Sequence, residues 1–222
     1  MITFDFHSHI LPGADHGARD REESRRILCT AKQAGIETIA ATPHFYPHRH
    51  HVEGFLKRRE EAYARLTEIR ATEDVPEILL GAEVLACPGI DNMSGLDRLT
   101  LDGTQILLLE MPFVAAELTD ELFETVERLI DECGYTVFMA HPNRYPDFCV
   151  DRMVAMGAKL QLNLEDTCSF KEGRRAKRWV REGLVYAVGS DVHHDEKIYK
   201  SLKKADKIVS AALDRINDPL HA

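Results

Sequence analysis

The chain has 222 residues, 44% of them hydrophobic, which is enough for one domain with a sizeable core. No Pro-, Gly- or Ser-rich stretch indicates a linker, so we expect a single domain over residues 1–222. The formal net charge of −9 argues against nucleic acid as a partner. No apolar run approaches the roughly 20 residues of a membrane-spanning helix, so we expect no membrane insertion.

The N-terminus and the cysteines indicate the compartment. The sequence begins directly on an apolar run, without the basic segment that opens a signal peptide. The five cysteines are odd in number and form no Cys-x-x-Cys pair. This pattern predicts reduced thiols in a cytoplasmic protein.

Seven short apolar runs each lead into a residue that can bind a metal ion or a phosphate group. In chain order they are residues 2–6 with His7 and His9, 38–41 with His44, 78–80 with Glu83, 106–109 with Glu110, 137–140 with His141, 160–162 with Asn163, and 185–188 with Asp191 and His193. Such runs are typical of buried parallel strands, whose carboxyl ends meet at one edge. We therefore expect the functional site at those ends.

The segments between the runs have a helical pattern, and four of them end on a glycine: Gly35, Gly134, Gly157 and Gly183. Glycine just past the last turn accepts the left-handed conformation that ends a helix. The alternation of helix and strand predicts an α/β fold with a parallel sheet. Ligands at nearly every strand end favour a closed or nearly closed barrel over an open doubly wound sheet, the alternative.

The strongest local motif is residues 5–9, Asp-Phe-His-Ser-His. Residues two apart in a strand point to the same face, so His7 and His9 can present two imidazoles to one metal ion. A single pair of this kind is weak evidence, because histidines are common in surface turns. Its weight comes from the carboxylates that follow other runs, since a buried carboxylate needs a compensating cation.

Six further segments complete the pattern: FHSHILPG (6–13) followed by Gly17, ATPH (41–44), GAE (81–83), LEMP (109–112), AHPNRY (140–145) and GSDVH (189–193). In this order the chain resembles the PHP superfamily, named for polymerase and histidinol phosphatase domains. Within it, the chain is most similar to the metal-dependent protein tyrosine phosphatases of bacterial capsule and exopolysaccharide synthesis. The resemblance implies a distorted seven-stranded (β/α)7 barrel that holds three divalent metal ions.

The resemblance also implies the metal ligands. They are His7, His9, Glu83 and Asp191 for one ion, the bridging Glu83 with Glu110 and His141 for the second, and His44, His193 and His16 for the third. His16 stands where similar proteins have an acidic residue, and the neighbouring Asp15 is the alternative ligand. Imidazoles mixed with carboxylates tolerate Mn, Fe or Zn, and the resemblance favours Mn.

These ligands suit hydrolysis of a phosphate monoester by attack of a metal-bound hydroxide on phosphorus. Arg144 would clamp the phosphoryl oxygens, unless it belongs to a surface salt bridge. His193 or its neighbourhood would supply a proton, and Asn163 would support a ligand. Lys197 is a possible stand-in for an arginine that some relatives carry shortly after His193. The implied substrate is a phosphotyrosine-containing protein, such as the tail of a tyrosine kinase that regulates capsule or exopolysaccharide synthesis.

Two other functions remain open: a histidinol-phosphate-type phosphatase of small molecules, and a non-catalytic metal-binding regulatory module. Residues 168–174 match the Cys-x5-Arg spacing of cysteine-based phosphatases, but this spacing arises easily by chance and lacks a glycine-rich cradle. Residues 45–51 form either a substrate-contacting lid or a solvated loop. The basic stretch 171–181 is either a solvated helix face or a dock for an acidic peptide.

Overall fold

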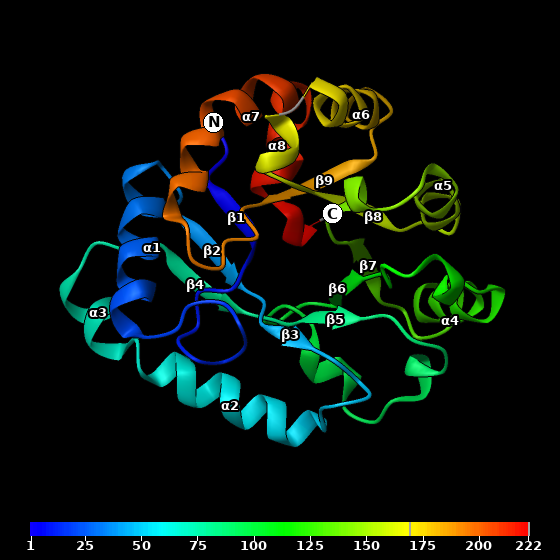
Figure 1. Cartoon of the computed structure of the whole chain (residues 1–222), viewed down its shortest axis with the longest axis horizontal. Helices are drawn as coiled ribbons and strands as arrows, with labels where there is room; N and C mark the ends of the chain where they lie inside the picture. The colour runs from blue at the N-terminus through cyan, green and yellow to red at the C-terminus, as the bar shows by residue number, and fades with distance from the viewer. Residues whose placement is uncertain (169, 222) are drawn as a thin grey trace.

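Parallel strands form two sheets in the computed structural model, which describes residues 1–168 and 170–221 (Figure 1). The first sheet has the order β1 (Phe4–Ser8), β2 (Thr38–Ala41) and β4 (Glu77–Leu80). The second has the order β3 (His44–Phe45), β5 (Glu83–Leu85), β6 (Ile106–Glu110), β7 (Thr136–Met139), β8 (Lys159–Asn163) and β9 (Val185–Gly189). The strands therefore follow chain order within each sheet, as the predicted alternation of helix and strand requires.

The helices lie around the strands (Figure 1). They are α1 (Arg21–Gln33), α2 (Val52–Ala64), α3 (Thr67–Thr72), α4 (Asp120–Asp131), α5 (Asp147–Ala155), α6 (Phe170–Arg181), α7 (Leu202–Val209) and α8 (Leu213–Asn217). The four glycines predicted to end helices all have a positive φ, from 75° at Gly134 to 100° at Gly35. The α/β prediction is confirmed. No helix in the described part of the chain is long and apolar enough to cross a membrane.

The expected closed barrel of seven strands is not confirmed. After two of the seven predicted runs the strand breaks for two residues, 42–43 and 81–82, and the chain then forms the further short strands β3 and β5, so the described chain contains nine strands. Before the breaks the chain pairs in the first sheet, β2 with β4. After the breaks it pairs in the second sheet, β3 with β5. Between β1 and β9 the described backbone forms an isolated bridge, Ser8 with Val192, in place of a continuous ladder.

A small apolar cluster joins the two sheets on their inner side. Its buried members are Phe4, Phe6, Ala40, Leu101, Ile106, Leu108, Phe138, Ala140 and Ala187. Phe6 on β1 stacks on Phe138 on β7 with ring centroids 4.8 Å apart. The register of β1 shifts between Asp5 and Ser8, so His7 reaches Gln161 on β8 although its neighbour Phe6 points into this cluster.

Gly189 at the end of β9 lies directly against β1. A Cβ added to Gly189 would lie 2.5 Å from the Cβ and 2.8 Å from the backbone nitrogen of His7. Only glycine allows this approach, which brings the two strand ends together below the predicted site.

We predict that Gly189→Ala lowers the free energy of unfolding by about 1–3 kcal/mol, because it overpacks a contact that the backbone of β1 cannot relieve. The control is Gly54→Ala in α2, where an added Cβ meets only the end of Arg58 at 3.9 Å. That variant should be more stable than wild type by about 0.5–1 kcal/mol. Urea denaturation measures both, and a Gly189→Ala protein as stable as wild type contradicts the prediction.

Candidate metal centre

The carboxylate of Glu83 lies at the centre of the predicted site and is buried. Glu83 Oε2 lies 3.2 Å from His7 Nε2, 3.3 Å from His9 Nε2 and 2.9 Å from His44 Nδ1. Its other oxygen, Oε1, lies 2.8 Å from His141 Nε2. One carboxylate therefore faces four imidazoles from three strand ends, those of β1 (His7 and His9), β2 (His44) and β7 (His141), which is the geometry expected of a bridging ligand.

His7 and His9 form the first cluster with Asp191. Their Nε2 atoms lie 3.2 Å apart, and Asp191 Oδ1 lies 3.6 Å from the first and 3.3 Å from the second. His7 Nδ1 lies 2.9 Å from Gln161 Oε1, and His9 Nδ1 lies 2.8 Å from Asp15 Oδ2. Gln161 Oε1 and Asp15 Oδ2 are both acceptors, so each Nδ1 donates a hydrogen bond and each ring presents its Nε2 to the centre.

Two buried atoms at the centre lack a hydrogen-bond partner. They are His44 Nδ1 and Glu83 Oε2, which face each other. Leaving such atoms unsatisfied costs roughly 1–3 kcal/mol each, and an ion between them removes that cost. The residues present therefore fit divalent metal ions.

Ligand atoms from the predicted residues gather in three groups within the described chain. They are His7, His9 and Asp191; His44, Glu83 and Glu110; and His9, His44 and His193. His141 adjoins the second group, with its Nε2 3.5 Å from Glu110 Oε1. The grouping differs from the expected one. His44, expected with the third ion alone, also lies beside Glu83 and Glu110, and His9, expected with the first ion, also lies beside His44 and His193. His16, expected with the third ion, is in none of these three groups.

The charges at the centre favour a cation. Burial raises the pKa of Glu83, but the neighbouring His7 and the contacts of Glu83 with His141 and His44 hold that pKa well below its usual value. Burial lowers the pKa of His141, yet Glu110 and Glu83 raise it to about 9. Glu83 therefore stays ionised and stabilises positive charge among the rings, whether protons or metal ions supply it.

Arg144 lies at the edge of the centre. It ends a 3₁₀ turn, Pro142–Arg144, that begins directly after His141, whose φ is 33°. Arg144 Nη2 lies 2.5 Å from Asp191 Oδ2 and 3.6 Å from Glu165 Oε1. The shorter ion pair of Arg144 is therefore with Asp191, a residue of the first cluster. The side chain of Arg144 is 37% exposed.

Arg175 on α6 holds the turn that carries Arg144. It donates from Nη1 to the carbonyl oxygen of Asn143 (3.2 Å) and from Nη2 to that of Tyr145 (3.2 Å). Its Nη2 also bonds Asp147 Oδ1 at 2.9 Å. Arg175 was expected only as part of a basic helix face, and nothing in the sequence pattern distinguishes it from its neighbours.

The sequence matches the family described as "Capsular polysaccharide synthesis, CpsB/CapC" over residues 3–216. The chain belongs to the CpsB/CapC family. It is 29% identical to the tyrosine-protein phosphatase YwqE of Bacillus subtilis over 86% of this chain and 77% of YwqE. It is 25% identical to the tyrosine-protein phosphatase CpsB of Streptococcus pneumoniae over 93% of this chain and 89% of CpsB. The resemblance predicted from the motifs is confirmed.

Solved structures agree with the fold of this CpsB/CapC chain. One of the crystal structures of YwqE and CpsB, described as metal-dependent tyrosine phosphatases, superposes with a TM-score of 0.74 at 23% identity, covering 96% of this chain and 95% of the other. Histidinol phosphate phosphatase from Lactococcus lactis, complexed with zinc, L-histidinol and phosphate, gives a TM-score of 0.61 at 13% identity, covering 95% and 94%. Both likenesses concern the fold alone.

In this CpsB/CapC chain the two candidate ligands of the third ion, Asp15 and His16, have different surroundings. Both oxygens of Asp15 are engaged: Oδ2 accepts from His9 Nδ1 (2.8 Å) and from the backbone of His44 (2.9 Å), and Oδ1 accepts from the backbone of Gly17 (2.8 Å). The exposed ring of His16 stacks on His44 with centroids 4.6 Å apart and lies 4.7 Å from His193. The geometry favours His16 as the ligand and Asp15 as a support for His9.

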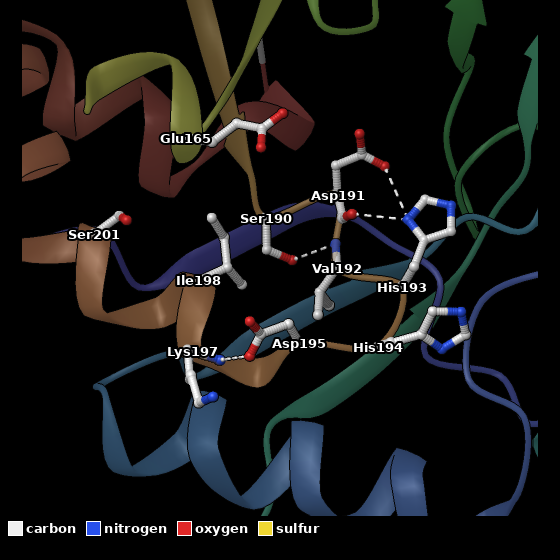
Figure 2. A pocket seen from close by; sticks show the side chains of 10 residues that line it. All are labelled: Glu165, Ser190, Asp191, Val192, His193, His194, Asp195, Lys197, Ile198 and Ser201. Atoms are coloured by element: carbon white, nitrogen blue, oxygen red, sulfur yellow. Dashed lines mark hydrogen bonds and ion pairs between the residues drawn. The ribbon is translucent and has the colours of Figure 1, made fainter. Parts of the chain in front are cut away.

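The structure also bears on two other sequence hypotheses, the phosphate contact of Lys197 and the Cys-x5-Arg match. Lys197 lines a cavity of about 530 Å³ with Asp191 and His193, but Figure 2 shows its side chain directed away from both, so its placement does not favour a phosphate contact. Cys168 and Arg174 line a separate cavity of about 350 Å³ that contains none of the predicted ligands. Ser169, within the Cys-x5-Arg match, lies outside the described residues.

Two polar residues of β8 support the centre, and of these the sequence predicted Asn163 but not Gln161. Gln161 Oε1 bonds His7, and Asn163 Nδ2 donates to Asp191 Oδ2 at 2.9 Å, which agrees with the supporting role expected of Asn163. The signal was present, because Gln161 and Asn163 alternate with leucines in the run Lys-Leu-Gln-Leu-Asn. Alternation places both polar side chains on the inner face.

We predict that His16→Ala binds one ion per chain fewer than wild type, whereas His16→Asp binds Mn at that position more tightly, because a carboxylate is the harder ligand. Asp15→Asn should weaken metal binding by about 10- to 100-fold by releasing His9, without removing the ligand itself. Metal analysis after dialysis against Mn and Zn measures both stoichiometry and preference. Full metal content in His16→Ala, with one ion lost in Asp15→Asn, shows instead that Asp15 is the ligand.

Proposed function

We propose that this chain is a metal-dependent phosphomonoesterase that acts on phosphotyrosine in a protein, and that residues 1–222 form one PHP-type domain with a distorted barrel. The observation that carries the proposal is the buried Glu83 carboxylate, surrounded by ring nitrogens of His7, His9, His44 and His141. The tyrosine phosphatase relatives supply the substrate class.

We assign the ligands as the sequence predicts: His7, His9, Glu83 and Asp191 for one ion, Glu83, Glu110 and His141 for the second, and His44, His193 and His16 for the third. When bound, divalent ions at such a centre lower the pKa of water and neutralise phosphoryl oxygens. Carboxylates mixed with imidazoles accept Mn, Fe or Zn, and we favour Mn because of the family resemblance.

Arg144 is the proposed phosphate clamp. Its guanidinium lies beside Asp191 and so at the edge of the first cluster, where a phosphoryl group bound by the ions would meet it. A preorganised cation stabilises the transition state more than the ground state, because negative charge on the phosphoryl oxygens increases there. This role requires the guanidinium to shift part of its bonding from Asp191 to the substrate.

His193 is better suited to bind a metal ion than to donate a proton. Burial and the neighbouring His9 lower the pKa of His193 to about 4, so the ring is neutral at pH 7. Its Nδ1 donates to the carbonyl oxygen of Asp191 at 2.9 Å, which leaves the lone pair on Nε2 for a metal ion. A tyrosine ester has little need of a proton donor, since phenol has a pKa of about 10.

We further propose that the substrate is the tail of a tyrosine kinase that regulates capsule or exopolysaccharide synthesis, in keeping with the family description. The five free cysteines support a cytoplasmic location, because thiols persist in reducing compartments. Arg144 beside the cluster favours catalysis over a purely regulatory metal-binding role.

We predict that chelation abolishes phosphatase activity and that adding back Mn restores it, whereas Cys168→Ser retains more than about half of wild-type activity, because Cys168 lies outside the metal centre. The assay compares a phosphotyrosine peptide, the matching phosphoserine peptide and histidinol phosphate. Turnover of histidinol phosphate alone identifies the small-molecule alternative. Full activity without metal excludes the proposed chemistry.

We predict that Arg144→Ala lowers kcat by about 10²-fold or more with unchanged metal content, because the clamp acts mainly on the transition state. Arg152→Ala is the matched control: Arg152 is 41% exposed and pairs with Asp120 on α4, outside the centre. Steady-state kinetics and metal analysis distinguish the two variants. Equal kinetics for both would place Arg144 in an ordinary surface ion pair.

A further inference from the structure

A second cavity, of about 410 Å³, adjoins the metal centre on the side of Glu110 and His16. Its remaining lining includes Tyr46, Phe113, Val114 and Arg49. Two aromatic side chains thus stand at a cavity that also contains two of the proposed metal ligands. Nothing in the proposed phosphate chemistry accounts for them.

Phe113 is unusually exposed for its size. It is 59% exposed and Val114 is 55% exposed, and within the described chain they are two of the four large hydrophobic side chains with high exposure. Both lie at this one cavity. Adjacent exposed apolar side chains at a functional site indicate a binding surface.

Phe113 is nevertheless held in place. Its ring stacks nearly parallel on Tyr145, with centroids 5.7 Å apart and planes 5° apart, and it lies 5.9 Å from His141. Tyr145 in turn is fixed by a hydrogen bond from its hydroxyl to the carbonyl oxygen of Met111 (2.8 Å). One face of Phe113 is therefore packed against the metal centre while much of the ring remains open.

Tyr46 also lines the cavity and is placed by a metal ligand. Its ring stacks on His44 with centroids 5.2 Å apart and planes 16° apart. Arg49 lies over the same ring at 5.8 Å and is a further lining residue. This placement favours a substrate-contacting role for residues 45–51 over a solvated loop.

We propose that this cavity, which we call the aryl slot (lined by Tyr46, Phe113 and Val114 beside Glu110 and His16), takes the phenyl ring of an aryl phosphate ester. Phe113 determines the specificity for aryl over alkyl esters. The inference rests on the proposed phosphomonoesterase function and deepens it. With the phosphoryl group at the ions, the ester oxygen points the ring past Glu110 into the slot, where stacking and apolar contact stabilise it.

The cavity on the other side of the centre is chemically different. Its lining includes Asp191 and His193 together with Glu165, Asp195, Lys197 and Ser201, and it contains no Phe, Tyr or Trp (Figure 2). Arg144, which pairs with Asp191 and Glu165, also lies on that side. The side that carries the Arg144 guanidinium therefore suits phosphoryl oxygens, and the aryl slot suits the leaving group.

The first test compares Phe113→Ala with wild type on phosphotyrosine and phosphoserine peptides of one sequence. We expect KM for the phosphotyrosine peptide to rise by about 10-fold, a size consistent with loss of one aromatic contact and its buried area, and kcat/KM for the phosphoserine peptide to change less than twofold. Phe148→Ala is the matched control, because Phe148 is 56% exposed on α5 and lines neither cavity. Equal losses on both peptides, or unchanged KM for phosphotyrosine, overturn the proposal.

A second variant and a binding measurement show whether an effect of Phe113→Ala comes from the lost aromatic ring or from general damage to the metal centre. Phe113→Leu keeps an apolar side chain over His141, and we expect it to retain wild-type metal content and to show a smaller rise in KM. Calorimetry of the metal-loaded protein with phenylphosphonate and methylphosphonate needs no turnover. Wild type should bind phenylphosphonate about 10-fold more tightly than methylphosphonate, and Phe113→Ala should lose that preference.

The binding measurement also separates the two proposals. If the protein hydrolyses no phosphotyrosine but prefers phenylphosphonate through Phe113, the proposed function fails and the aryl slot stands. If wild type hydrolyses phosphotyrosine but binds the two phosphonates equally, the function stands and the slot is excluded.

Discussion

At the centre of the molecule the carboxylate of Glu83 is 1% exposed and meets imidazoles from His7, His9, His44 and His141. A buried carboxylate without a partner is costly, so the strand ends must hold positive charge around it. The breaks in the strands serve this placement. His44 and Glu83 are paired in register just past the two breaks, and the buried Arg59 donates to the carbonyl oxygen of Gly81 at 3.0 Å, directly before β5.

The join between β1 and β9 depends on a second buried carboxylate, Asp5. It accepts hydrogen bonds from the backbone of Ser190 (2.7 Å) and from the hydroxyl of Tyr199 (2.7 Å). Burial raises the pKa of Asp5 despite these bonds. A side chain thus connects the two sheets where no continuous ladder does, and it fixes the chain between β9 and the loop that carries Asp191 and His193.

The sequence predicted which side chains gather at the centre because all of them except His16 follow an apolar run, and parallel strands bring such positions together whatever their separation along the chain. The sequence did not predict that the chain forms a further strand, in the other sheet, after each break at residues 42–43 and 81–82. A proline or glycine after an apolar run, here Pro43 and Gly81, indicates only that the strand ends. The shift in β1 that turns His7 toward Gln161 is a tertiary effect with no local signal. The choice between Asp15 and His16 depended on hydrogen bonds to His9 and to the backbone of His44, which spacing cannot reveal.

The proposed ligands extend along the chain from His7 to His193, so an unfolded chain offers no comparable site. Ions that bind only the folded form add RT ln(1 + [L]/Kd) to its stability, about 2.7 kcal/mol for one site at a hundredfold excess over Kd. Metal supply therefore acts on the amount of folded protein as well as on its chemistry. A cell short of the ion would hold less of the protein itself, because the metal-free form unfolds and is degraded more often.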